Sequence, residues 1–282
     1  MTISNNRLFQ LFKYAVYALL AFNIYIFWSD EILAAAVEYS SGVPGDKYIS
    51  AFAATIDTAA WVVLLLMFEL ETYVLEDRHF NKTVSGSLQA VRVLCYAVIV
   101  YAMYGYVANL MFHYQIATLV GVSDLCTLVS DGWSYAIDLD EYAEITASNC
   151  GSFSEVGAYL RFENMPIAVD AAGIKNIRTL AWLDVVNAAV WLLIVVVLEV
   201  DVWLQERDRL EGSALRISNA SKFVLYGLLL LAAIYWGVKG DFVDFWDAFL
   251  WLVAFVFIEL NVFEWRQEVN ESAIQSHITT SS

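Results

Sequence analysis

The chain has 282 residues, of which 60% are hydrophobic and 16% are charged, and its mean hydropathy is +0.59. A soluble domain is roughly half apolar and about a quarter charged, so this composition predicts an integral membrane protein. The formal net charge of −16 leaves little to attract phosphates and excludes a nucleic-acid-binding protein.

Six stretches are long and apolar enough for membrane helices, because a bilayer core of about 30 Å needs about 20 mostly apolar residues. The first stretch lacks a small-residue cleavage site, so we interpret it as an uncleaved helix. Continuous apolar runs such as Val190 to Leu198 favour helices over a β-barrel. The predicted fold class is an all-α polytopic membrane protein. The six predicted spans are 8–28, 55–75, 90–112, 180–203, 220–238 and 244–264.

The positions of lysine and arginine predict the orientation. Ten of the 15 lie at the ends of spans that face one side, among them Arg7, Arg78 and Arg207. We therefore expect both termini in the cytoplasm, beneath a plasma membrane or a bacterial inner membrane. The long segment 114–178, which carries nine acidic residues, would then lie on the exterior.

Two of the three cysteines lie in this exterior segment. Cys126 and Cys150 are 24 positions apart, whereas Cys95 lies within the third span. In an oxidising compartment, a disulfide closing this loop would stabilise it by about 3 kcal/mol. We predict that disulfide, and the alternative is a pair of free thiols.

The second, fourth and sixth spans share one sequence pattern. Starting from Ile56, Val186 and Trp246, they align without a gap over eighteen residues. Each contains an aspartate or asparagine, then a tryptophan, seven apolar residues, a glutamate, and an acid or amide two positions later. The matched residues are Asp57, Trp61, Glu69 and Glu71; Asn187, Trp191, Glu199 and Asp201; and Asp247, Trp251, Glu259 and Asn261.

The first, third and fifth spans resemble one another more weakly. Each opens with a basic residue followed four positions later by a tyrosine: Lys13 with Tyr17, Arg92 with Tyr96, and Lys222 with Tyr226. We therefore predict three copies of a two-helix hairpin around a pseudo-threefold axis along the membrane normal. The copies cover 1–89, 90–219 and 220–268, the second includes the exterior insertion, and 269–282 is a cytoplasmic tail.

The repeated glutamates Glu69, Glu199 and Glu259 are the main candidate site residues. A carboxylate at the end of an apolar run must protonate, pair or face water. In one interpretation, each pairs with the basic residue and tyrosine of an antiparallel helix and fixes how the hairpins pack. In the other, the three carboxylates form a ring, and the acids and amides at both ends of the repeat form a polar stripe for a monovalent cation or proton.

The repeated tryptophans lie about one turn inside the exterior end of each helix. Trp61, Trp191 and Trp251 are therefore expected to form an aromatic belt at the membrane interface.

The sequence contains no phosphate-binding loop, nucleophile elbow or dinucleotide fingerprint, and its three histidines are scattered. We expect no enzyme, no cofactor and no metal site. Two functions follow from the remaining features. The first is a small cation or proton channel or carrier. The second is a structural or accessory subunit of a homo-oligomer or larger membrane complex, which docks through its aromatic-rich helices and acidic exterior loop.

Overall fold

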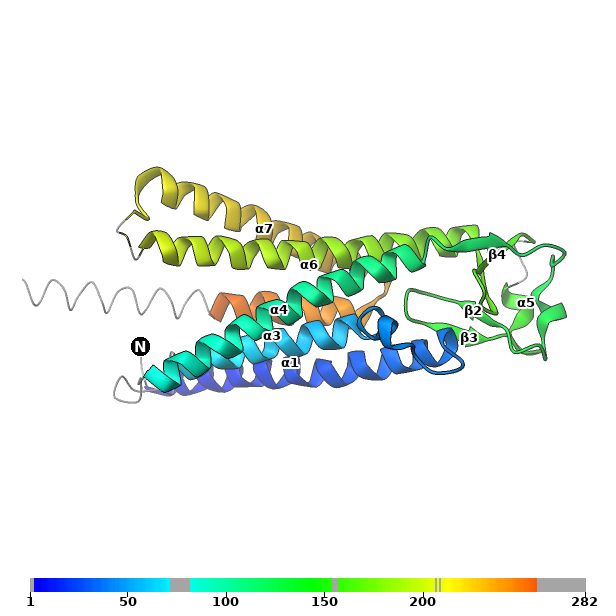
Figure 1. Cartoon of the computed structure of the whole chain (residues 1–282), viewed down its shortest axis with the longest axis horizontal. Coiled ribbons are helices and arrows are strands. Elements are labelled where there is room, and N and C mark those ends of the chain that lie inside the picture. The colour runs from blue at the N-terminus through cyan, green and yellow to red at the C-terminus, as the bar shows by residue number, and fades with distance from the viewer. Residues whose placement is uncertain (1–2, 72–81, 154–156, 206, 208, 258–282) are drawn as a thin grey trace, which may run out of the picture. The chain divides into compact units, whose positions relative to one another are not determined.

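The computed structural model describes residues 3–71, 82–153, 157–205, 207 and 209–257 (Figure 1). This part of the chain is mostly helical. By length and composition, four of its helices are able to cross a membrane, and a fifth span results if one bent helix pair is counted as a single span. The four are Leu8–Glu38, Thr83–Phe112, Ala171–Gln205 and Gly212–Lys239, and the bent pair is Gly45–Ala51 with Ala53–Glu69.

The chain forms two compact units, residues 1–22 with 211–282 and residues 23–210, and helix α1 (Ile3–Glu38) contributes to both. In the first unit, α7 (Gly212–Lys239) ends at Gly240, whose φ of 93° is left-handed. Glycine adopts this conformation at no steric cost, so it ends the helix. A second helix follows over residues 242–257. Its Phe257 ring lies 5.3 Å from the ring of Phe9.

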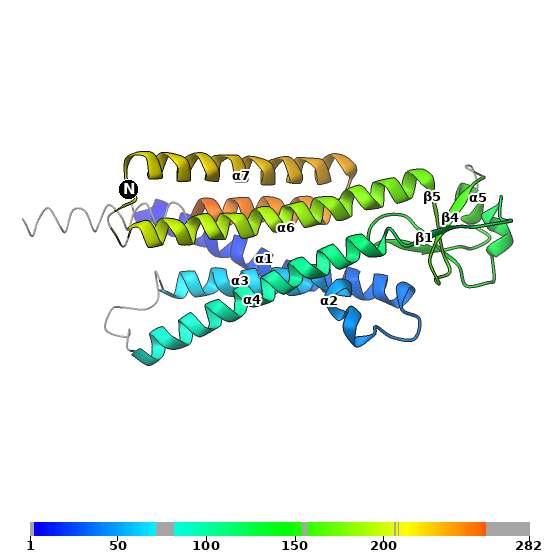
Figure 2. The same cartoon turned by 45° about the horizontal axis from the view of Figure 1, so that its top comes forward.

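The second unit contains a broken helix. The helices η1 (Gly45–Lys47) and α2 (Tyr48–Ala51) precede α3 (Ala53–Glu69), with a bend of 68°. The bend falls at Phe52 and therefore involves no proline. Helix α4 (Lys82–Phe112) packs against α2, α3 and α6 (Ala171–Gln205), and it runs obliquely across α3 in Figure 2.

The described residues of the predicted spans are helical, but several observed helices are longer, and residues 72–75 of the second predicted span lie outside the described residues. The first continues past Trp28 to Glu38, and the fourth begins at Ala171. Hydropathy marks the length that fits the bilayer core, whereas a helix continues beyond it wherever its ends are capped or packed. The sixth predicted span is helical up to residue 257, and the remainder of 244–264 lies outside the described residues.

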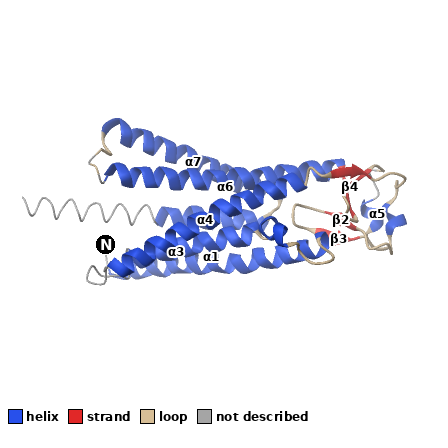
Figure 3. Ribbon diagram, in the orientation of Figure 1, coloured by secondary structure: helices blue, strands red, loops and turns tan. Residues whose placement is uncertain are grey.

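The predicted exterior segment folds as a five-stranded sheet, which we call the insertion (residues 113–170). Figure 3 shows its strands together at the ends of α4 and α6. The all-α prediction is therefore wrong for this segment. Strands of three or four residues are too short to show the alternating pattern that marks a strand in sequence. The strands are β1 (Ile116–Thr118), β2 (Ser134–Ala136), β3 (Tyr142–Glu144), β4 (Tyr159–Phe162) and β5 (Ile167–Asp170), in the spatial order β1-β4-β5-β2-β3.

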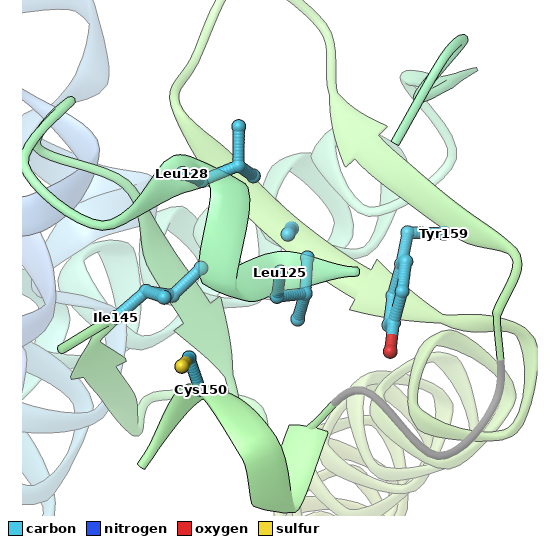
Figure 4. Packing of buried hydrophobic residues seen from close by; sticks show 6 residues of the cluster. Leu125, Leu128, Ile145, Cys150 and Tyr159 are labelled. Carbon is cyan, nitrogen blue, oxygen red and sulfur yellow. The ribbon is translucent and has the colours of Figure 1, made fainter. Parts of the chain in front are cut away.

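The insertion has its own small apolar core (Figure 4). Two short helices, η4 (Leu125–Leu128) and α5 (Cys150–Phe153), pack together over the sheet. The predicted disulfide between Cys126 and Cys150 joins them and is confirmed. The buried core residues are Leu125, Leu128, Ile145, Cys150, Tyr159 and Ala168.

Strand β5 continues directly into α6. The Asp170 carboxylate accepts a hydrogen bond of 2.5 Å from the backbone N–H of Gly173 and so caps the first turn of the helix. The site leaves little room for a side chain at residue 173, because a Cβ there would lie 3.0 Å from Val169 Cγ2 and 3.1 Å from Asp170 Oδ1. This cap holds the sheet and the helix in one continuous element.

Replacing Asp170 by alanine is expected to destabilise the protein by about 1 kcal/mol, because a helix N-cap is lost. Asp170→Asn, which retains an acceptor oxygen, should recover most of that loss. Asp131→Ala, at an exposed position of the insertion, is the matched control. Thermal unfolding in detergent measures all three variants, and equal stability of Asp170→Ala and Asp131→Ala would contradict the capping role.

Candidate functional site

Among the repeated acids, Glu71 forms an ion pair with a basic residue. Its carboxylate forms an ion pair with Arg92, with an N–O distance of 2.6 Å between the end of α3 and the start of α4. Both side chains are partly exposed, at 22% for Glu71 and 32% for Arg92. The predicted basic residue of the third span therefore binds a repeated acid, and this pair ties α3 to α4.

The second repeated glutamate has the tyrosine partner that the sequence predicted. The hydroxyl of Tyr96 donates a hydrogen bond of 2.8 Å to Glu199 and joins α4 to α6. Glu199 itself is exposed, whereas Glu69 at the matching position of α3 is buried. At the next repeated position the order is reversed, since Asp201 is buried and Glu71 is only partly so.

This difference between copies coincides with a local change in helix geometry. Residues 70 and 71 form a widened π-type turn, whereas α6 continues as a regular α-helix through Asp201. The acids at matching positions of α3 and α6 therefore differ in exposure and in local helix geometry.

The structure also locates the other predicted site residues. Lys13 and Tyr17 are buried, and Lys222, Tyr226, Asp57, Asn187 and Asp247 are half-buried. The Oδ1 atom of Asn187 is buried and accepts no hydrogen bond from any residue the structure describes. The ring of Tyr226 lies 6.2 Å from that of Phe255 in the first unit. Glu259 and Asn261 lie outside the described residues.

The repeated tryptophans are packed inside the protein. Trp61, Trp191 and Trp251 are 6% to 8% exposed, and the rings of Trp61 and Trp191 lie 5.9 Å apart. The prediction of an interfacial belt is therefore wrong. The belt was predicted from depth along the helix, but the helix face decides whether a ring meets lipid or protein, and depth carries no information on the face.

Glu31 is an important residue that sequence reasoning missed. Its Oε1 accepts a hydrogen bond of 2.8 Å from the backbone N–H of Ala54, and its Oε2 accepts one of 3.2 Å from Thr55. These N–H groups belong to the first turn of α3, just after the bend. A carboxylate at a helix N-terminus satisfies free donors and interacts favourably with the helix dipole. Glu31 of α1 therefore caps α3 from another helix.

Glu38, the last residue of α1, contacts the insertion. Tyr142 of β3 donates a hydrogen bond of 2.7 Å to its carboxylate. Burial and the neighbouring Glu38 charge raise the pKa of Tyr142 well above its ordinary value, so its hydroxyl remains a donor. Burial and the Glu38 charge also raise the pKa of Tyr39 to about 12.

A sequence signal for Glu31 and Glu38 does exist. They are seven residues apart and so share one helix face, and the segment between them, Ile32–Val37, is wholly apolar. An acid on each side of a further apolar turn indicates that the helix continues past Trp28. The span was predicted to end at Trp28, because the apolar run that begins at Leu8 stops there, before Asp30 and Glu31.

The junction between α4 and β1 is built around a buried histidine. His113 is 1% exposed, its Nδ1 lies 2.8 Å from the carbonyl oxygen of Asn109, and its ring packs on Phe162 with centroids 5.6 Å apart. The Nε2 atom has no hydrogen-bond partner among the described residues. Burial, and then the charge of Arg178, lower the pKa of His113 to about 4.

Because the folded protein favours neutral His113, acid is expected to destabilise it. The ordinary histidine pKa is 6.5. The contribution of neutral His113 to the stability of the folded protein is therefore complete above that pH and is lost as the pH falls towards 4. Between pH 7.5 and 5.5 the expected loss is about 1.3 kcal/mol. His113→Asn retains a donor to Asn109 but does not titrate, so its thermal unfolding temperature should vary less over this range. An identical pH dependence in the variant would contradict the assignment.

Within the described ranges, no group of three or more histidine, cysteine, aspartate or glutamate side chains is arranged to hold a metal ion. Comparisons with protein-family models, with curated proteins and with solved structures find no match to this chain. The contacts described above are hydrogen bonds and the Glu71–Arg92 ion pair, which join helices to one another and to the insertion.

Proposed function

We propose that this protein is a structural or accessory subunit of a membrane complex, which holds its insertion rigidly at the membrane surface for a partner protein. The observation that carries the proposal is the attachment of the insertion to three helices. Tyr142 binds Glu38 of α1, β5 continues into α6 through the Asp170 cap, and the His113 carbonyl at the end of α4 accepts from Arg178 of α6. A domain fastened at three points presents its surface in one orientation, which lowers the entropic cost of docking.

The contacts of the repeated acids support the same proposal. Glu71 binds Arg92, and Glu199 binds Tyr96, so both acids join neighbouring helices. The rings of Trp61 and Trp191 add an apolar contact between α3 and α6. These contacts favour a role in packing over a shared ion path. The proposed architecture has six spans in three hairpin repeats around a pseudo-threefold axis.

The charge of the insertion indicates what kind of partner it would bind. Residues 113–170 contain nine acidic residues and one arginine. An acidic surface steers a basic partner during encounter and makes the association rate depend on salt. The partner is therefore expected to present lysine and arginine to the insertion.

Site-specific crosslinking in native membranes tests this function. A photoreactive residue replaces Val120, which is 86% exposed in the insertion, and the matched control replaces Phe223, which is 81% exposed on α7. A discrete crosslinked complex is expected from residue 120 only, and its yield should fall when the exposed acids Asp131 and Glu141 are neutralised. Absence of any crosslink, together with a monomer in native detergent, would refute the proposal.

A second candidate function is transport of a proton or monovalent cation. It is favoured by the burial of Glu69 and Asp201, which are each 5% exposed on largely apolar helices. Ionisable groups inside a membrane segment often mark ion pathways. The expected result is loss of ion flux in liposomes when Glu69, Glu199 and Glu259 are all replaced by glutamine. Glu211→Gln, at an exposed position, is the control, and unchanged flux in the triple variant would exclude this function.

The proposed topology places both termini in the cytoplasm of a plasma membrane or bacterial inner membrane, with the insertion outside. The Cys126–Cys150 disulfide supports an oxidising environment for the insertion. Protease added to sealed cells is expected to cut an epitope placed at residue 120 and to spare tags at either terminus. Cleavage of the terminal tags would contradict the proposed orientation and place the termini outside.

A further inference from the structure

Helix α6 begins with two cations in a region that is otherwise acidic. Lys175 and Arg178 lie within one turn of each other, shortly after the acidic insertion. The Nε of Arg178 donates a hydrogen bond of 3.0 Å to the His113 carbonyl, and its guanidinium lies 4.4 Å from the ring centroid of Tyr114. These two contacts hold the guanidinium in place while using only one of its five N–H donors.

Neither cation is paired with a carboxylate of the residues that the structure describes. The contacts of Arg178 are those with His113 and Tyr114. Lys175 is exposed, and only its backbone carbonyl is engaged, as acceptor for Thr179. Two unpaired basic groups within one turn of each other attract an anion. They form a local positive site in a chain whose net charge is −16.

Aromatic side chains flank the cations on the membrane side. Trp182 follows Arg178 by four residues, about 6 Å along the helix. Its Nε1 donates a hydrogen bond of 3.2 Å to the hydroxyl of Tyr114, and both rings are 48% exposed. Exposed tryptophan and tyrosine at the end of a membrane helix mark the depth of the lipid headgroups.

The helix places these groups on one side. Lys175 and Trp182 are seven residues apart and differ by about 20° in direction, and Arg178 lies about 60° from Lys175. The two cations therefore share a helix face with Trp182 and precede it by one to two turns, and in a helix that crosses the membrane this is the depth of the lipid phosphates.

We propose that Lys175 and Arg178, with Trp182 and Tyr114 beneath them, bind the phosphate of an anionic phospholipid in the leaflet that contacts the insertion. The guanidinium matches the phosphate oxygens with paired donors, and the lysine adds a second positive charge. An acidic protein is a poorer fit, because the exposed rings lie where α6 enters its apolar span. The assignment depends on α6 crossing the membrane and is independent of the assembly function, because the lipid would bind to the isolated protein.

The test uses the full-length protein in detergent, titrated with phosphatidylglycerol or phosphatidylcholine and followed by native mass spectrometry. Selective binding of phosphatidylglycerol is expected. Removing one basic residue near a membrane surface weakens binding of acidic lipid about fivefold, so Lys175→Gln should lose about fivefold and Lys175→Gln with Arg178→Gln about 25-fold. Arg178→Lys retains the charge but loses the paired donors, so its affinity should lie between that of the native protein and that of Arg178→Gln.

The control variant, Lys47→Gln with Arg161→Gln, removes the same charge from the same predicted side and should change affinity less than twofold. Lys175→Gln breaks no side-chain contact in the described structure, so its effect does not reflect misfolding. Equal binding of the two lipids, or an equal effect of the control, would overturn the proposal. Competition by inorganic phosphate or polyglutamate as strong as that by phosphatidylglycerol would also overturn it, in favour of a soluble anion or an acidic protein.

Discussion

Gly105→Ala is expected to be the most damaging small substitution in the helices, with a loss of about 3 kcal/mol in stability. A Cβ at residue 105 would lie 2.4 Å from the backbone carbonyl oxygen of Ile49 and 3.1 Å from its carbonyl carbon. Because the contacted atoms belong to the backbone of α2, rotating a side chain cannot relieve the clash. Helix α2 would have to move away from α4, and the buried Ile49 would lose its packing.

Gly86→Ala in the same helix provides the matched control. A Cβ at residue 86 meets no atom within 4 Å, so the substitution only improves helix propensity, by about 0.5–1 kcal/mol. Thermal unfolding in detergent, followed by tryptophan fluorescence, should therefore shift in opposite directions for the two variants. Equal shifts would mean that the close approach of α2 to α4 does not constrain residue 105.

Loss of the Cys126–Cys150 disulfide is expected to have an effect of similar size on the insertion. The bridge closes a loop with a sequence separation of 24, and its removal costs about 3 kcal/mol in the chain-entropy model. Cys150 is also buried in the small core beside Leu125 and Tyr159. The variant with both cysteines replaced by serine should be cut within the insertion by low concentrations of protease, while the helices remain intact.

Reduction of the native protein should reproduce this sensitivity, and non-reducing electrophoresis should show the accompanying change in mobility. Cys95→Ala is the control, because Cys95 is a free buried thiol in α4 and its removal leaves the bridge in place. If the double serine variant resists protease as well as Cys95→Ala does, the core and the sheet alone stabilise the insertion.

Much of the helical architecture could be predicted from hydropathy, whereas the ends of the helices could not. Glu31 and Glu38 extend α1 because each has a partner on another element, at the start of α3 and on β3. Such partners are separated by 23 to 104 positions in the sequence. Local composition therefore gave a boundary at Trp28, where the apolar run is first interrupted.

The residue types that pair with the repeated acids could be predicted, but which acid each of them contacts could not. A basic residue and a tyrosine at the start of the third span were expected to meet glutamates, and the structure brings Tyr96 to Glu199. Arg92, however, binds Glu71 and not one of the three repeated glutamates. Successive acids two residues apart point in directions that differ by about 200°, so a small change in helix rotation decides which one reaches the partner.

The sequence by itself determined the presence of long apolar helices able to cross a membrane, their approximate positions and the pairing of Cys126 with Cys150. These properties follow from composition, run length and cysteine position, which are read directly along the chain. Only the tertiary structure decided which acids are buried, that the repeated tryptophans are interior, and that the insertion is a sheet joined to α1, α4 and α6. The physical reason is that these helices are apolar on nearly every side, so no stripe in the sequence distinguishes the face that meets lipid from the face that meets protein.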